Sequence, residues 1–156
     1  MTATLISRSE LSDFARDLRA RGELIILANG CFDLIHVGHI RYLAAAKQLG
    51  GKLLVGINSD KQVRCLKGNG RPAICQDERA EIVAAIRFVD AVTIFDEPTV
   101  EDLIRIVRPD FHAKGTDYTA ESVPERETVK ECGGQVAIVG DPKEHSSSAL
   151  IEVLTR

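Results

Sequence analysis

The segment 24-LIILANGCFDLIHVGHIRYLAAAKQLGGKLLVGI-57 decides the fold of this chain. An apolar run at residues 23–28 and a second at 52–57 have the length and composition of buried strands. Between them, residues 38–49 carry apolar side chains at helical spacing and stop at a pair of glycines, which commonly end helices. A strand, a helix and a second strand in this order predict a parallel βαβ unit with a right-handed crossover.

The same alternation of apolar and amphipathic segments continues along the rest of the chain. The second strand is expected to lead into a polar loop that contains 67-KGNGRP-72. Five strands alternating with helices predict a doubly wound, Rossmann-like α/β fold, with a five-stranded parallel sheet covered by helices on both faces. Further strands are expected at residues 91–95, 110–114 and 135–140, and further helices at residues 9–20, 77–88, 100–107, 124–132 and from 147 onward.

The length of 156 residues suits a single domain with a sizeable core. We expect residues 1–22 to form an N-terminal helical segment and residues 23–156 to form the main domain. The formal net charge of −3 gives no general attraction to nucleic acid or to anionic membranes, so neither is expected as a partner. No apolar run has the length of a membrane span, and residues 1–10 lack the pattern of a secretion signal.

Cysteine usage points to a reducing compartment. The four cysteines show neither CxxC spacing nor the density of a disulfide framework. Such a pattern is typical of reduced thiols in a cytoplasmic protein, and it makes a zinc site unexpected.

The loop between the first strand and its helix carries the residues that indicate chemistry. Asn29 and Gly30 turn the chain at the carboxyl end of the strand, and Gly38 lets a ligand approach the backbone where the helix opens. A helix N-terminus offers unpaired N–H groups to a phosphate, and His36 and His39 would add two side-chain donors. Metal ligation and a buried structural role for one histidine are the alternatives. The segment matches neither GxxxxGK[ST] nor GxGxxG.

The run 30-GCFDLIHVGH-39 resembles the G-x-F-D-x-x-H-x-G-H signature of the cytidylyltransferase-like nucleotidyltransferases. The resemblance extends over nearly the whole chain and implies a nucleotidyltransferase fold for residues 23–156. Within this family, the adenylyltransferase domain that makes ADP-heptose is the most similar. The segments that carry this narrower resemblance are 66-LKGNGRP-72, 114-KGTDY-118 and 146-SSSALIE-152. One departure is His145, which stands where the family carries an apolar residue.

The resemblance implies an enzyme that transfers AMP from ATP to D-glycero-β-D-manno-heptose 1-phosphate, giving ADP-heptose and pyrophosphate. It also implies Mg²⁺ that arrives with ATP rather than in a protein metal site, a homodimer, and a role in lipopolysaccharide biosynthesis. Within the same fold, the alternative is a cytidylyltransferase for glycerol 3-phosphate or another alcohol phosphate. A catalytically idle nucleotide-binding module is the alternative from another class.

The resemblance also assigns the site residues. For Asp33, hydrogen bonds from backbone N–H groups are expected, and contact with Mg²⁺ is the alternative. The serines of the last helix could either cap that helix or bind phosphate. The assignments are catalysis for His36, His39 and Lys67, nucleotide binding for Asn29, Gly30, Cys31, Phe32, Gly38, Lys114, Gly115, Asp117, Ser146, Ser147 and Ser148, and substrate binding for Asp33, Arg71, Arg79 and Tyr118.

Overall fold

Six parallel strands form one sheet, in the order β1-β4-β3-β2-β5-β6. This computed structural model describes residues 2–142 and 144–155. The strands are β1 (Thr4–Leu5), β2 (Ile25–Gly30), β3 (Lys52–Asn58), β4 (Ala91–Phe95), β5 (Phe111–Lys114) and β6 (Gln135–Ile138). The helices are α1 (Leu11–Ala20), α2 (Val37–Lys47), α3 (Asp60–Lys67), α4 (Gln76–Ala84), α5 (Glu101–Val107), α6 (Arg126–Glu131) and α7 (Ser147–Leu154), and a 3-10 turn, η1 (Arg8–Glu10), precedes α1.

The structure confirms the doubly wound α/β fold and corrects two details of it. All five predicted strands are present, but the sheet has a sixth strand, because Thr4 and Leu5 pair with β4. Two residues are too short a run to show any periodicity. Part of the predicted polar loop is the helix α3, which begins where the side chain of Ser59 accepts a hydrogen bond from the N–H of Gln62. The N-terminal segment therefore contributes a strand as well as a helix.

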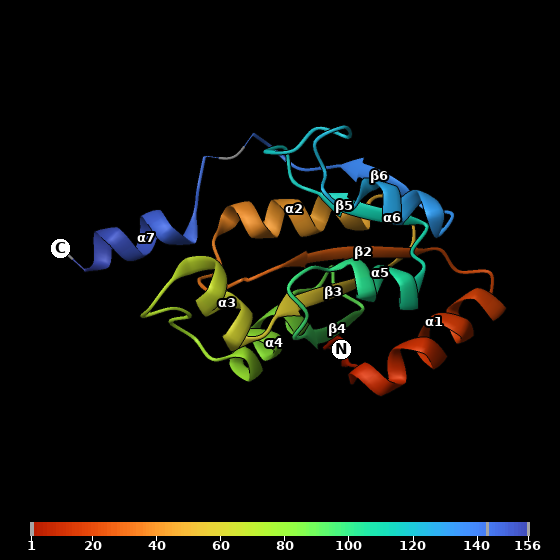
Figure 1. The fold of residues 1–156 in the computed structure, drawn as a ribbon, viewed down its shortest axis with the longest axis horizontal. Coiled ribbons are helices and arrows are strands. Elements are labelled where there is room, and N and C mark those ends of the chain that lie inside the picture. Colours follow the sequence, from red (N-terminus) through yellow and green to blue (C-terminus); the bar gives the residue numbers. More distant parts are fainter. Residues whose placement is uncertain (1, 143, 156) are drawn as a thin grey trace.

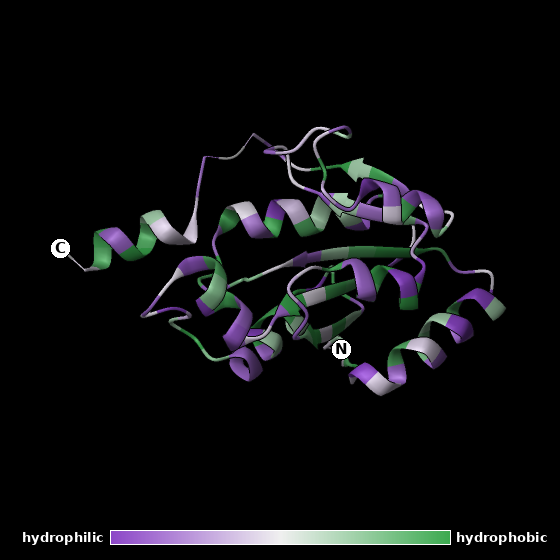
Figure 2. Ribbon diagram, viewed as in Figure 1, coloured by the Kyte–Doolittle hydropathy of each residue, from purple (hydrophilic) through white to green (hydrophobic). Residues whose placement is uncertain are grey.

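Helices cover both faces of the sheet and produce two apolar layers. One layer lies between the sheet and helices α2 and α4, where Leu43 and Val83 are fully buried. The other lies between the sheet and helices α1, α5 and α6, where Leu11 and Leu103 are buried. The hydropathy colouring shows this arrangement, with apolar strands inside and polar residues on the outer sides of the helices (Figure 2). Burial of this kind contributes about 25 cal/mol for each Å² of apolar surface removed from water.

The chain reverses the direction of strand addition at β2. From β2 the sheet extends through β3 and β4 on one side and through β5 and β6 on the other. The carboxyl ends of these strands meet at one edge, next to the start of α2, and helix α7 lies beyond that edge, apart from the sheet (Figure 1). A crevice at such a reversal is the usual ligand site of doubly wound folds. Within the described residues, every helix is too short or too polar to cross a bilayer.

Candidate active site

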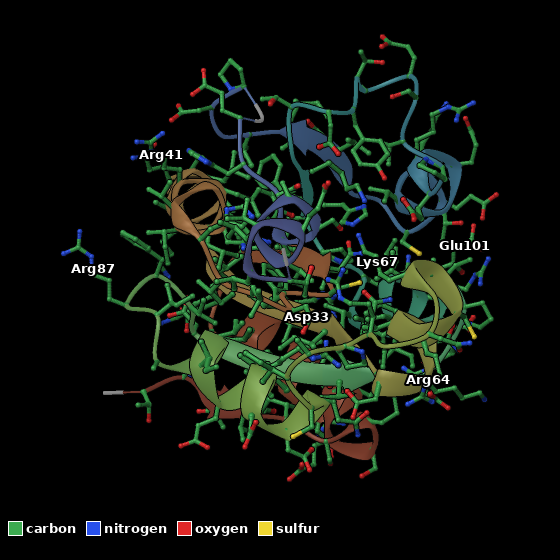
Figure 3. The ribbon with its side chains drawn as sticks, turned by 90° about the vertical axis from the view of Figure 1, so that its left-hand side faces the viewer. Asp33, Arg41, Arg64, Lys67, Arg87 and Glu101 are labelled. Carbon is green, nitrogen blue, oxygen red and sulfur yellow. The ribbon has the colours of Figure 1, made fainter. Side chains whose placement is uncertain are left out.

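A cavity of about 370 Å³ opens at the carboxyl ends of β2 and β5, at the predicted edge of the sheet. Figure 3 looks onto this edge and shows Asp33 and Lys67 near its centre, whereas Arg64, on the same helix as Lys67, points outward. Every site residue expected from the sequence lines the cavity except Arg79. Segments more than one hundred residues apart in the chain therefore contribute to one site.

The histidine pair forms the start of α2. His36 is the N-cap residue, and its Nδ1 accepts a hydrogen bond from the N–H of Gly38 at 3.1 Å. His39 Nδ1 accepts from the backbone N–H of His36 at 3.3 Å. A ring nitrogen that accepts a hydrogen bond carries no hydrogen, so in this arrangement the ring hydrogen resides on Nε2. The two rings stack with their centroids 4.0 Å apart, and both line the cavity. The helix cap thus fixes two imidazoles in the tautomer that can donate through Nε2.

Gly38 is required by this ring arrangement. A Cβ atom at this position would lie 2.9 Å from Cε1 and 3.0 Å from Nδ1 of His36. Any other residue would therefore displace the ring that caps the helix. The sequence indicated a glycine that admits a ligand, and the structure adds that the nearest group it admits is the His36 imidazole.

Phe32 packs against His39 of the histidine pair. Its backbone has φ of 49°, a left-handed conformation that is unfavourable for a residue with a bulky side chain. Its side chain is buried, and the ring centroid lies 5.2 Å from that of His39. Backbone strain of this kind persists where the surrounding structure enforces it, which is common at functional sites.

Asp33 joins the two loops that flank the cavity. Its carboxylate is almost fully buried and accepts hydrogen bonds from Nε of Arg71 at 2.7 Å and from the N–H groups of Ala73 and Ile74. Burial alone would raise the pKa of Asp33, but these hydrogen bonds outweigh it and hold the pKa below its usual value. These contacts match the expectation that Asp33 orients the loop through backbone N–H groups, and they occupy both of its oxygens.

Arg79 does not reach the cavity, which corrects its assignment to substrate binding. Its side chain is fully buried and donates to the backbone carbonyls of Ile74, Cys31 and Asn58. It also forms an ion pair with Asp60 at 2.8 Å. A guanidinium has five N–H donors, and that of Arg79 donates to four protein acceptors, the three carbonyls and the carboxylate of Asp60. Arg79 therefore holds the loops behind the site together.

Two cations border the cavity on the side of α3. Lys67 ends α3 and is exposed, and Arg71 follows in the loop. The Arg71 side chain is only 12% exposed, and its Nη2 is buried without a hydrogen-bond partner among residues 2–142 and 144–155. An unsatisfied guanidinium donor at a cavity wall suits an anionic ligand, since burial of such a group without a partner is costly.

Lys114, the last residue of β5, is a third cation at the cavity. Lys114 is 8% exposed, and its Nζ lies 4.4 Å from the centre of the Tyr118 ring. Burial lowers the pKa of Lys114 from its usual value, and the carboxylates of Glu125 and Asp117 oppose that shift. Gly115 leaves space for Asp117, because a Cβ at Gly115 would lie 2.9 Å from the Asp117 Oδ1.

Of the three serines at the start of α7, one caps the helix and two contact other parts of the site. Ser146 caps the helix by accepting from the N–H of Ala149 at 3.1 Å, and Ser147 donates to the carbonyl of Leu34 at 2.8 Å. Ser148 Oγ lies 3.5 Å from Nη1 of Arg71. The capping function expected as an alternative is therefore present, in residues that also line the cavity.

Cys31 lies in the cavity wall as a neutral contact residue. Burial raises the pKa of its thiol, which opposes formation of the nucleophilic thiolate. Its Sγ lies 3.9 Å from Oδ1 of Asn58, the last residue of β3. Asn58 lines the cavity but was not predicted from the sequence, although its place at the carboxyl end of a strand was a usable signal.

Further lining residues come from segments with weak sequence signals. Arg41 and Asp141 form an ion pair at 3.5 Å at the cavity, and His145 has its ring centroid 6.0 Å from that of His36. Arg41 lies within α2 and Asp141 in a loop, and no sequence motif marks either residue, so only the fold identifies them. Within residues 2–142 and 144–155, no group of three or more His, Cys, Asp or Glu side chains is placed to hold a metal ion.

The chain is similar to known proteins over most of its length. A family model described as cytidylyltransferase-like matches residues 27–153. The protein "Bifunctional protein HldE" of Koribacter versatilis is 48% identical over 150 residues, which cover 96% of this chain and 31% of that protein. The protein of the same name from Methylobacillus flagellatus is 47% identical over 136 residues, which cover 87% of this chain and 28% of that protein. This chain thus spans less than a third of the length of these relatives.

The fold is also similar to that of solved structures. The lipopolysaccharide core biosynthesis protein from Thermoplasma volcanium GSS1 superimposes with a TM-score of 0.69 at 23% sequence identity. The match covers 78% of this chain and 100% of that one. At this level of identity the likeness bears on the fold alone.

Proposed function

Because this chain belongs to the cytidylyltransferase-like family, we propose that it is an adenylyltransferase that converts ATP and D-glycero-β-D-manno-heptose 1-phosphate to ADP-heptose and pyrophosphate. The observation that carries the proposal is the histidine pair at the start of α2, with both rings held as Nε2–H donors at a cavity bordered by Lys67 and Arg71. The similarity to proteins named HldE and the three segments that resemble the ADP-heptose branch support the sugar substrate.

In the proposed reaction, an oxygen of the sugar phosphate attacks the α-phosphorus of ATP. The new P–O bond joins AMP to the sugar phosphate, and the bond to the bridging oxygen breaks as pyrophosphate leaves with the electron pair. No covalent enzyme intermediate is needed, so the protein contributes position and charge stabilisation. His36, His39 and the N-terminus of α2 would stabilise the phosphates, because fixed donors bind more tightly as negative charge develops.

The cations have distinct places in this scheme. Lys67 and Arg71 approach from the α3 side, where they would bind the leaving phosphates or the sugar phosphate. Lys114 and Asp117 approach from β5, where they would contact the nucleoside or the sugar. Asp33 would act indirectly, since its oxygens hold Arg71 and the following backbone in place.

We also propose that Mg²⁺ enters with ATP. Asp33 offers little to a metal ion because both of its oxygens accept hydrogen bonds from the protein. Phosphate oxygens and water therefore fit better as the main ligands of the ion, as is usual for Mg²⁺ bound with nucleotides. The chemistry that the ion would supply is neutralisation of charge on the phosphates.

A pyrophosphate-release assay with Mg²⁺ tests the proposal. Wild-type protein is incubated with ATP or CTP and with a panel that contains heptose 1-phosphate, mannose 1-phosphate and glycerol 3-phosphate. Turnover with ATP and the heptose substrate alone is expected. Turnover with CTP and glycerol 3-phosphate would instead favour the cytidylyltransferase alternative, and silence with every pair would favour an idle nucleotide-binding module.

Two further properties of the chain are part of the proposal. We propose that it forms a homodimer and acts in the cytoplasm, as the family resemblance and the reduced cysteines imply. Sedimentation equilibrium of the purified protein would measure the first. A mass corresponding to the monomer at all concentrations would contradict it.

A further inference from the structure

His112 is a fully buried imidazole that contacts a residue of the cavity wall. It belongs to β5, and the strand register places it beside Leu27 of β2 and Val136 of β6, two apolar residues. Its Nε2 lies 2.8 Å from Oδ1 of Asn29, which is 83 residues earlier in the chain and lines the cavity. The polar side chain of His112 thus lies in an apolar layer, and from there it reaches Asn29 in the cavity wall.

The protonation state of His112 determines the direction of this hydrogen bond. Burial, together with the nearby positive charge of Lys114, lowers the pKa of His112 to about 3, so the ring is neutral at physiological pH. The amide oxygen of Asn29 can only accept, so Nε2 of His112 donates. Nδ1 then carries no hydrogen, and it has no hydrogen-bond partner among residues 2–142 and 144–155.

Packing alone does not explain a histidine at this position. A buried ring nitrogen without a partner costs stability, and a leucine would fill a similar space without that cost. Among the residues that the structure describes, the hydrogen bond to Asn29 is the one contact of His112 that an apolar side chain could not make. The gain must therefore come from what the bond does to Asn29.

Asn29 lines the cavity, and its NH₂ group is the end of the amide that His112 does not bind. With Nε2 of His112 as the donor, exchange of the amide oxygen and nitrogen would lose this hydrogen bond, and in the bonded orientation the NH₂ group retains two donors. We propose that His112 is a positioning residue that holds the Asn29 amide with its N–H donors turned toward the bound nucleotide. Donors are the suitable groups here, because Lys67, Arg71 and Lys114 already mark the cavity as a site for an anion.

This inference rests on the proposed nucleotide-binding function, and its test measures nucleotide affinity without any sugar. ATP and CTP are each titrated into wild-type protein and into His112→Leu by calorimetry. The leucine variant should bind the preferred nucleotide about fivefold more weakly, the effect of one neutral hydrogen bond. Its melting temperature should be unchanged or higher, since the unpartnered Nδ1 is gone. His112→Gln should recover part of the affinity, because its amide N–H can donate at the place of Nε2.

A double-mutant cycle separates positioning from a general structural effect. In an Asn29→Ala background, His112→Leu should cause no further loss of affinity, because the group that it positions is absent. Val136→Ala is the matched control from the same layer, and it should lower the melting temperature while affinity stays constant. An equal loss in both backgrounds, or wild-type affinity in His112→Leu, would overturn the inference.

The outcomes also separate this inference from the proposed reaction. Suppose that His112→Leu weakens binding of ATP or CTP only when Asn29 is present, and that heptose 1-phosphate is not turned over. This result would support the positioning role and contradict only the proposed substrate. Wild-type protein that binds neither nucleotide would overturn both.

Discussion

The guanidinium of Arg71 lies 2.7 Å from the carboxylate of Asp33, and this ion pair joins the loop after β2 to the loop after α3. Both side chains are largely buried, Asp33 almost completely. The pair brings the glycine-containing loop against the histidine loop, and both of its residues line the cavity.

Replacement of Asp33 by alanine should destabilise the protein and weaken substrate binding. Removal of one partner from a buried ion pair typically costs about 3–5 kcal/mol, because the other charge stays buried without compensation. Urea unfolding would measure this loss. Asp33→Asn retains an acceptor for the N–H groups of Ala73 and Ile74 and should lose less. Equal stability of wild type and both variants would show that the loop does not depend on this pair.

Replacement of His39 by asparagine should remove catalysis and retain the helix cap. The asparagine Oδ1 can take the place of Nδ1 and accept from the N–H of His36, whereas the Nε2 donor is lost. We expect kcat to fall about 100-fold with little change in KM for ATP, as for loss of one preorganised donor.

His39→Ala is the comparison for this variant, since it removes the cap as well and should also lower the melting temperature. A value of kcat within twofold of wild type in His39→Asn would contradict the proposed role of Nε2.

Lys67 and Arg64 provide a matched pair of basic residues on α3. Lys67 lines the cavity, whereas Arg64 points outward (Figure 3). Lys67→Met should lower kcat/KM about 10- to 100-fold, because a charge-assisted phosphate contact is lost. Arg64→Met has the same change in charge and should retain nearly full activity. Similar losses in the two variants would indicate a general effect of net charge rather than a specific contact.

Arg79→Met should unfold or strongly destabilise the protein. The variant leaves the carbonyls of Ile74, Cys31 and Asn58 without their donor and removes the partner of Asp60. Buried acceptors without partners cost about 1–3 kcal/mol each. Chemical denaturation would measure the change. A stable Arg79→Met protein with a selective rise in KM for the sugar phosphate would restore the original assignment of Arg79 to substrate binding.

The stability of the protein should fall as pH decreases from about 6.5 toward 3. In the unfolded chain His112 takes up a proton near its usual pKa of 6.5, but burial lowers the pKa to about 3 in the folded protein and keeps the ring neutral above that pH. The unfolded state binds more protons in this interval, so stability is lost by up to about 1.4 kcal/mol per pH unit. Urea unfolding between pH 7 and pH 4.5 would measure the slope.

His112→Leu is the control for this pH dependence, because it lacks the titrating group and should show a shallower slope. The pKa of Asp33 is also lowered in the folded protein, so its contribution to protein stability is likewise lost as pH falls. That loss occurs only at the low pH where carboxylates take up protons. An identical slope in wild type and His112→Leu would show that His112 does not titrate on unfolding.

The sequence by itself determined the fold class and most of the site. Apolar runs of strand length and helices at regular spacing predicted the parallel sheet, and parallel strands bring their carboxyl ends to one edge. The family resemblance assigned the segments around His36, Lys67, Lys114 and Ser146 to one site, and the structure places them around one cavity. Apolar runs and helical spacing depend only on neighbouring residues, so the sequence shows them directly.

Only the tertiary structure decided which polar side chains face a ligand and which hold the site together. Arg79 and Arg71 are both arginines near the same loops, yet Arg79 is fully buried among carbonyl groups and Arg71 borders the cavity. The bond between Asn29 and His112 joins residues 83 positions apart. Neither the burial of a side chain nor its partner across the sheet follows from local periodicity. Both depend on which segments pack together, because burial decides whether a polar group must find its partner within the protein.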